Sequence, residues 1–222
     1  MSIIKPFAWA KKEDIENKAN NVLLTSKLSL NERIKPDKIA DFFDLGIVWE
    51  KIPADGDGII AARIFPAQKL IEINKDFPRL MESRGLEAFT IAHEIGHWVL
   101  HINQDEAEGL IQQQELNLDI SKENHSFLCR SINGATSTSN NMEWQADYFA
   151  GSLLMPRNLL EETRKGRNLQ NWNHLQVMAD DLGVSRSALK VRLEQIGWIC
   201  IPKNSQQIHL GKEPCNTQGN LF

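Results

Sequence analysis

The sequence predicts an α+β fold, in which a few short strands form a small mixed sheet between flanking helices. Two observations support this prediction. Apolar residues recur at helical spacing before residue 46 and again after residue 86, whereas the stretch between them consists of short apolar runs broken by turn residues. The chain has 222 residues, of which 41% are hydrophobic, so it can bury one sizeable core. The order of helix, sheet and further helices is typical of a single α+β domain.

The first half of the chain begins with two predicted helices. Ile15, Ala19 and Val22 recur at helical spacing, which indicates an amphipathic helix over residues 10–28. Pro36 opens a second helix, and Gly46 lies where a C-terminal cap belongs. Three strands and one long helix are expected next, over residues 47–52, 59–65, 70–74 and about 86–101.

The second half is predicted to be helical apart from one long connection. Residues 102–142 are acidic and glutamine-rich at first, then small and polar, so we expect an irregular excursion with one short strand near 126–130. Helices follow at about 142–154, 157–165, 171–182 and 186–196. We expect one domain over residues 1–202, with a helical C-terminal part at about 157–198, and a poorly ordered tail over 203–222.

Charge and apolar content argue against several broad classes of protein. The formal net charge is −4 and the pI is about 5.9. Proteins that bind nucleic acid or membrane surfaces through much of their chain are usually strongly basic, so this class is not expected. No stretch approaches the roughly 18 apolar residues of a membrane span, and charged residues interrupt the N-terminus before a signal-peptide core develops. Three cysteines without CxxC spacing are not typical of a disulfide framework. We therefore expect a cytoplasmic protein with no membrane partner.

A metal-binding motif lies in the long central helix. His93, Glu94 and His97 form the pattern H-E-x-x-H, and residues four apart share one face of a helix. The two imidazoles can therefore bind one zinc ion, while Glu94 can act as the general base on a water that zinc acidifies. Apolar neighbours on both sides predict a buried helix, which favours this interpretation over two surface histidines spaced four apart by chance. We expect one Zn²⁺ per chain, and Mn²⁺ is a possible replacement.

The third protein ligand is expected on a second helix. Glu143 can ligate the ion, and Asp147, one turn later, can accept a hydrogen bond from the distal nitrogen of a zinc-bound histidine. His101 continues the four-residue spacing, but it lies about 12 Å from His93 along a continuous helix, so we interpret it as a helix-end residue near the last carbonyls. Weaker rivals for the third ligand lie in the irregular excursion, at Glu106, Glu108, Glu115 and Glu123.

Several segments together resemble the ImmA/IrrE family of bacterial metallopeptidases. They are the run Phe-Thr-Ile-Ala-His-Glu-Ile-Gly-His at 89–97, the run Glu-Trp-Gln-Ala-Asp-Tyr-Phe-Ala-Gly-Ser-Leu-Leu-Met-Pro at 143–156, and parts of 184–197. The resemblance implies a gluzincin-like metallopeptidase domain with a zinc-binding helix pair. It also implies cleavage of a helix-turn-helix repressor, which relieves repression of genes for stress responses or mobile elements. The partner would then be a protein substrate, a DNA-binding repressor.

One different class of function stays open at this point. Residues 176–195 have the spacing of a helix-turn-helix, with Gly183 at the turn and Ser185 as a possible cap. Arg186, Lys190 and Arg192 could then contact phosphates, so the alternative is a zinc-containing DNA-binding regulator without proteolytic activity. Packing of two helices on the core is the simpler interpretation. A surface that docks the substrate is a third possibility.

The mode of substrate binding is predicted from the last strand before the zinc helix. Leu70, Ile71, Glu72 and Ile73 alternate in polarity, and we expect an edge strand along which an extended substrate pairs. The excursion over 102–142 joins the two ligand-bearing helices and is expected to restrict entry. The residue that stabilises the transition state is not evident from the sequence, because Tyr148, His125 and His174 are all weak candidates.

Overall fold

The four main strands form one mixed sheet in the computed structural model, which describes residues 3–28, 32–54, 58–115, 127–130 and 139–211. The strands are β1 (Gly46–Glu50), β2 (Ile60–Phe65), β3 (Leu70–Asn74) and β4 (Phe127–Arg130), in the spatial order β1-β3-β2-β4. β1 and β3 are parallel, whereas β2 is antiparallel to both β3 and β4. The predicted α+β class and small mixed sheet are therefore confirmed.

The position of β3 in the sheet corrects one prediction. β3 lies between β1 and β2, and its Ile71 pairs with Ile47 on one side and with Ile64 on the other. Both of its hydrogen-bonding edges are occupied, so the predicted edge strand over Leu70–Asn74 is wrong. Alternation of polarity shows that a segment is a strand, but the order of strands depends on contacts distant in sequence.

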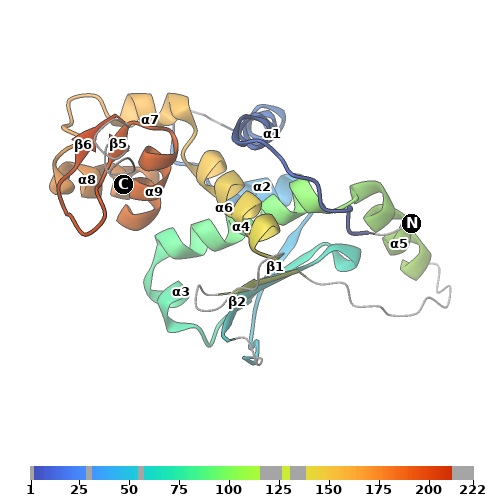
Figure 1. The fold of residues 1–222 in the computed structure, drawn as a ribbon. Coiled ribbons are helices and arrows are strands. Elements are labelled where there is room, and N and C mark those ends of the chain that lie inside the picture. The colour runs from blue at the N-terminus through green and yellow to red at the C-terminus, as the bar shows by residue number, and fades with distance from the viewer. Residues whose placement is uncertain (1–2, 29–31, 55–57, 116–126, 131–138, 212–222) are drawn as a thin grey trace, which may run out of the picture.

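Two packed helices dominate the side of the sheet that carries the central motif. α4 (Arg84–His101) contacts both β2 and α6 (Ser139–Leu154), and α6 contacts α1 (Lys12–Thr25), as Figure 1 shows. Gly96 permits the close approach of α4 to α6, because a Cβ atom there would lie 3.1 Å from both Cα and the carbonyl oxygen of Ala146. α2 (Pro36–Phe42) packs on α4 as well, so α4 is covered on several sides.

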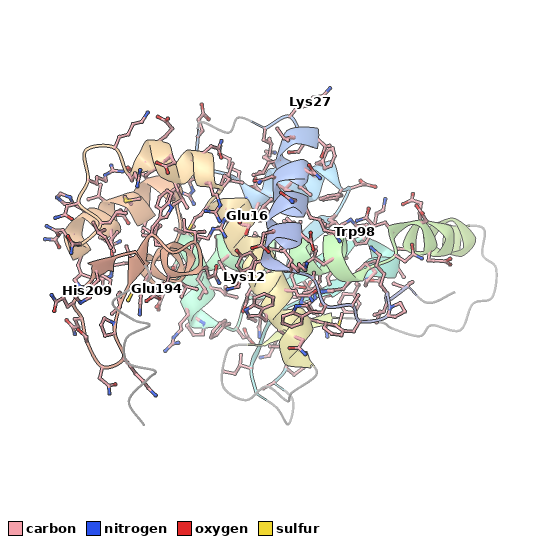
Figure 2. All side chains as sticks on the ribbon, turned by 45° about the horizontal axis from the view of Figure 1, so that its top comes forward. Lys12, Glu16, Lys27, Trp98, Glu194 and His209 are labelled. Carbon is pink, nitrogen blue, oxygen red and sulfur yellow. The ribbon has the colours of Figure 1, made fainter. Side chains whose placement is uncertain are left out.

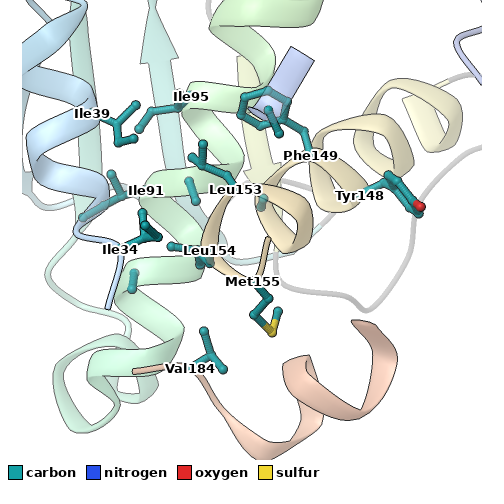
Figure 3. Packing of buried hydrophobic residues seen from close by; sticks show 14 of the residues in the cluster. Ile34, Ile39, Ile91, Ile95, Tyr148, Phe149, Leu153, Leu154, Met155 and Val184 are labelled. Atoms are coloured by element: carbon teal, nitrogen blue, oxygen red, sulfur yellow. The ribbon is translucent and has the colours of Figure 1, made fainter. Parts of the chain in front are cut away.

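The core is continuous across these helices. Ile91 and Ile95 on α4 face Leu153 on α6, and Ile39 of α2 joins the same cluster, as shown in Figure 3. Val184 enters the cluster from the C-terminal helices. This packing fixes the position of α4 relative to α6. It therefore also fixes the distance between side chains that these two helices direct toward each other.

The C-terminal part consists of three helices and a short hairpin. These are α7 (Arg157–Thr163), α8 (Trp172–Leu182), α9 (Arg186–Gln195), β5 (Ile199–Cys200) and β6 (His209–Leu210). The hairpin extends the folded part to residue 211, beyond the boundary predicted at 202, and residues 212–222 lie outside the described part of the chain. Cys200 is disulfide-bonded, contrary to the expectation from cysteine spacing.

Several elements differ from the sequence-based prediction. α5 (Gln104–Glu115) is a helix within the segment expected to be irregular, and its Ala107 is fully buried. Gly46 begins β1 and does not cap α2, because the chain already turns at Asp44, where φ is +57°. The remaining elements are η1 (Pro66–Gln68) and α3 (Pro78–Glu82). Within the described ranges, no helix has the length and apolar character that a membrane span requires.

Candidate metal centre

α4 places two histidines on one buried face. The helix begins at a Ser83 cap, whose side chain accepts a hydrogen bond from the backbone N–H of Leu86, and it continues without a break to His101. His93 and His97 are four residues apart, are 3% and 0% exposed, and have their Nε2 atoms 3.0 Å apart. The predicted convergence of the two imidazoles is therefore present in the fold.

α6 brings a carboxylate to the same point. Oε2 of Glu143 lies 3.1 Å from Nε2 of His93, and Oε1 lies 3.4 Å from Nε2 of His97. These three residues form a group that could hold a metal ion, with one possible ligand atom from each and all of those atoms within 4.8 Å of one another. Ligands about 2.1 Å from a tetrahedral ion lie about 3.4 Å apart, so the observed separations fit zinc.

Asp147 lies one helical turn after Glu143 and contacts the opposite nitrogen of His93. Its Oδ1 is 2.8 Å from Nδ1 of His93. The carboxylate can accept a hydrogen bond from Nδ1–H of His93, and this contact orients the ring so that Nε2 faces Glu143. The contact that the sequence predicted between Asp147 and a histidine of the motif is present.

Glu94 is buried without hydrogen-bond partners in the described part of the structure. The residue is 0% exposed, and neither of its carboxylate oxygens has a partner there. Desolvation raises the pKa of Glu94 to about 8, since the attraction of His93 opposes it only in part and the charge of Glu143 adds to it. A buried carboxylate beside two histidines and another carboxylate favours a cation at this point.

The pKa values of Glu143 and His97 are both lowered, for different physical reasons. Burial raises the pKa of Glu143, but the adjacent imidazoles of His93 and His97 outweigh burial, so the pKa falls well below its usual range. Desolvation lowers the pKa of His97. A carboxylate that stays ionised and an imidazole that stays neutral are both in the form that binds a metal ion.

His101 is the last residue of α4, as predicted, and it is buried. It is 4% exposed, and its Nδ1 lies 3.0 Å from Nδ1 of His97. Its Nε2 lies 3.1 Å from Oε1 of Gln145, which the sequence analysis did not identify. Desolvation lowers the pKa of His101 to about 4. The four-residue spacing from His97 was the signal that could have placed this contact.

The remaining candidates lie elsewhere or outside the described residues. Glu108 forms an ion pair with Lys69 at 2.7 Å, and His174 accepts a hydrogen bond from the backbone of Asn168. Tyr148 is buried against Arg192 on the α1 side of α6. Glu106 lies on α5 and is not part of the His–His–Glu group. The side chains of Glu115, Glu123 and His125 are not described.

The fold and the His–His–Glu group together define a protein of the metallopeptidase class. Residues 60–194 match the IrrE N-terminal-like domain of peptidase family M78, which is more than half of the chain. The chain therefore belongs to this family of zinc metallopeptidases, and the resemblance seen in the sequence is confirmed.

One solved structure shares the fold at low sequence identity. It is a Mycobacterium tuberculosis transcriptional regulator, with 17% identity and a TM-score of 0.50. The match covers 82% of this chain but 46% of the regulator, so the chain spans less than half of that protein. The comparison with curated protein sequences found no significant match to this chain.

Proposed function

We propose that this protein is a zinc-dependent endopeptidase that cuts one peptide bond in a specific cytoplasmic protein. The observation that carries the proposal is the buried Glu94 carboxylate beside the triangle of His93, His97 and Glu143. A structural zinc site is closed by its ligands and needs no additional base, whereas a hydrolytic site needs one. A single ion per chain fits the three ligands, and Mn²⁺ could occupy the same donor set.

In the proposed reaction each side chain has one role. When bound, zinc supplies a Lewis acid that polarises the peptide carbonyl and acidifies water. Glu94 accepts a proton from the attacking water, whose oxygen adds to the carbonyl carbon. The C–N bond then breaks, and Glu94 returns the proton to the leaving amine. His93, His97 and Glu143 hold the ion, and Asp147 keeps His93 in the tautomer that binds through Nε2.

For the substrate we propose a helix-turn-helix transcriptional repressor, whose cleavage relieves repression. This rests on the family resemblance, which associates such peptidases with regulators of stress responses. An extended loop of the repressor would have to reach the site. The terminal strand of the described sheet on the β2 side is β4, which also contacts α4, so we place the substrate strand along β4 in preference to β3.

The alternative is a DNA-binding regulator without proteolytic activity. In its favour, α8 and α9 are joined by a tight turn in which Gly183 has φ +66° and Ser185 caps α9. Against it, Arg192 is 1% exposed and donates to Glu16, so it does not reach a phosphate. Arg186 lies over the ring of Trp172. We propose that these helices belong to one domain that extends from the N-terminus through residue 211.

The test is cleavage of a candidate repressor by the purified protein. The repressor encoded nearest to this chain is incubated with the zinc-loaded protein, and products are identified by mass spectrometry. We expect one discrete cut, which disappears with a chelator and falls about 10²–10⁴-fold in Glu94→Gln, although that variant retains zinc. Glu87→Gln in the first turn of α4 is the matched control and should cut normally. Equal cleavage by Glu94→Gln and wild type would contradict the assignment of the base.

A further inference from the structure

We propose that the N-terminal segment Ile3–Trp9 is part of the metal centre, and that it fixes the orientation and tautomer of His97 through His101 and Gln145. The inference rests on the proposed zinc function and assigns a positioning role to residues that do not touch the ion. Residues 3–9 lie outside the part of the chain that matches the family, which begins at residue 60.

A continuous chain of polar contacts runs from the candidate ligand to the N-terminal segment. Nδ1 of His97 lies 3.0 Å from Nδ1 of His101, and Nε2 of His101 lies 3.1 Å from Oε1 of Gln145. Nε2 of Gln145 donates to the carbonyl oxygen of Ala8 at 3.1 Å. All three side chains are buried, with exposures of 0%, 4% and 2%. Contacts among buried polar groups are strong, and they hold the side chains in one arrangement.

The donor and the acceptor of each hydrogen bond in this series follow from the last contact, which is with the carbonyl oxygen of Ala8. A backbone carbonyl only accepts, so the amide nitrogen of Gln145 faces Ala8 and its oxygen faces His101. The oxygen of Gln145 also only accepts, so His101 carries its proton on Nε2. In a neutral imidazole, Nδ1 of His101 is then an acceptor, and Nδ1 of His97 must be the donor. The lone pair of His97 is therefore on Nε2, the atom that faces Glu143.

The N-terminal segment is anchored at both helices that carry the ligands. The backbone N–H of Lys5 donates to the carbonyl of His101 at 2.8 Å, and that of Asn103 donates to the carbonyl of Ile3 at 2.7 Å. Further along, the ring of Trp9 stacks on Trp144, with centroids 5.4 Å apart and planes 3° apart. In Figure 1 this segment runs from the C-terminal end of α4 toward α1. It therefore holds the Ala8 carbonyl in place between the two helices.

The two candidate histidine ligands consequently have different outer partners. Nδ1 of His93 contacts a carboxylate on α6, whereas Nδ1 of His97 contacts a neutral imidazole. Each partner selects the Nδ1–H tautomer, which is the one that binds a metal through Nε2. Loss of such an outer partner typically lowers metal affinity about 10–100-fold.

The first test compares zinc affinities of two His101 variants by chelator competition. His101→Leu removes the acceptor, and we expect zinc affinity to fall about 10–100-fold. His101→Asn places a side-chain oxygen close to the position of Nδ1, and we expect it to recover most of the affinity. His209→Leu, on the hairpin far from the centre (Figure 2), is the histidine control and should bind as wild type. Unchanged affinity in a folded His101→Leu protein would overturn the proposal.

The second test reads the tautomer directly and does not depend on activity. Nitrogen-15 NMR of the metal-free protein should show the His97 proton on Nδ1 and the His101 proton on Nε2. Gln145→Leu should remove this preference and increase amide exchange at Lys5, because the N-terminal segment loses its bond to α6. A His97 proton on Nε2 in the wild-type protein would overturn the proposal. If the tautomers are as stated but the protein binds no zinc, the proposed function fails and the hydrogen-bond chain stands.

Discussion

Nδ1 of His93 lies 2.8 Å from Oδ1 of Asp147, a residue 54 positions later in the chain. The contact joins α4 to α6 at the candidate metal centre, and it is made by a carboxylate that is half exposed. Because Asp147 shares a face of α6 with Glu143, one helix supplies both a candidate ligand and the partner of another candidate ligand.

This relationship predicts the effect of changes at Asp147. Asp147→Ala should lower zinc affinity about 10–100-fold, since His93 loses the acceptor that orients it. Asp147→Asn retains an acceptor oxygen and should lose less. Zinc affinity is measured by competition with a chelating dye, and Asp41→Ala, at an exposed side chain of α2, is the control. An Asp147→Ala protein that binds zinc as tightly as wild type would show that the contact has no role in metal binding.

The choice of Glu143 as third ligand can be tested against another carboxylate, Glu108, which was a weaker candidate in the sequence. Glu143→Ala should reduce zinc affinity by more than the roughly 10–100-fold typical of an outer partner, because it removes a direct ligand. Glu108→Ala should have no effect on zinc, since Glu108 pairs with Lys69 at 2.7 Å. The measurement is the zinc content after dialysis, together with the competition assay. If Glu108→Ala lost zinc and Glu143→Ala kept it, Glu143 would be the wrong choice of third ligand.

The close approach of α4 and α6 predicts a different outcome for two helical glycines. Gly96→Val should destabilise the protein by about 1–3 kcal/mol and weaken zinc binding, because the side chain pushes against the backbone of Ala146. A Cβ atom at Gly109 meets nothing within 4 Å in the described structure, so Gly109→Ala should be neutral or stabilise by up to about 1 kcal/mol. Urea denaturation with and without zinc measures both effects. Equal stability of Gly96→Val and wild type would mean that the helices can separate at no cost.

The ion pairs of Glu16 predict a stability that depends on pH. Glu16 on α1 (Figure 2) accepts from Arg157 at 2.7 Å and from the buried Arg192 at 2.8 Å. Burial raises the pKa of Glu16, but the hydrogen bond to Arg157 and the charge of Arg192 lower it by more. The folded-state pKa therefore lies below the ordinary 4.5. The stabilisation is therefore complete above pH 4.5 and is lost as the pH falls through the folded-state pKa.

Glu16→Gln tests this prediction by urea denaturation at neutral and acidic pH. At pH 7 the variant should be less stable by about 3–5 kcal/mol, because Arg192 remains buried without its carboxylate. The difference should shrink as the pH falls below 4.5. Glu13→Gln, on the exposed face of the same helix, is the control and should change stability little. A difference that does not depend on pH would show that the ionised carboxylate is not responsible.

The sequence by itself determined the local part of the site. His93, Glu94 and His97 lie on one helix, and a four-residue spacing places two side chains on one face whatever surrounds that helix. The same periodicity identified α6 and the relation of Glu143 to Asp147. Short strands and most helices were also correctly predicted, because their signals lie within a few neighbouring residues.

Only the tertiary structure decided which distant residues meet. β3 proved to be an inner strand because β1 pairs with it in parallel, and alternation within β3 contains no information about that neighbour. His101 contacts Gln145 of α6 because Gly96 lets α6 approach α4 closely. The N-terminal segment reaches Gln145 by backbone pairing at the end of α4, and no side-chain pattern specifies that pairing. Helix periodicity is set by local backbone geometry, whereas strand order and helix docking depend on packing between residues far apart in the chain.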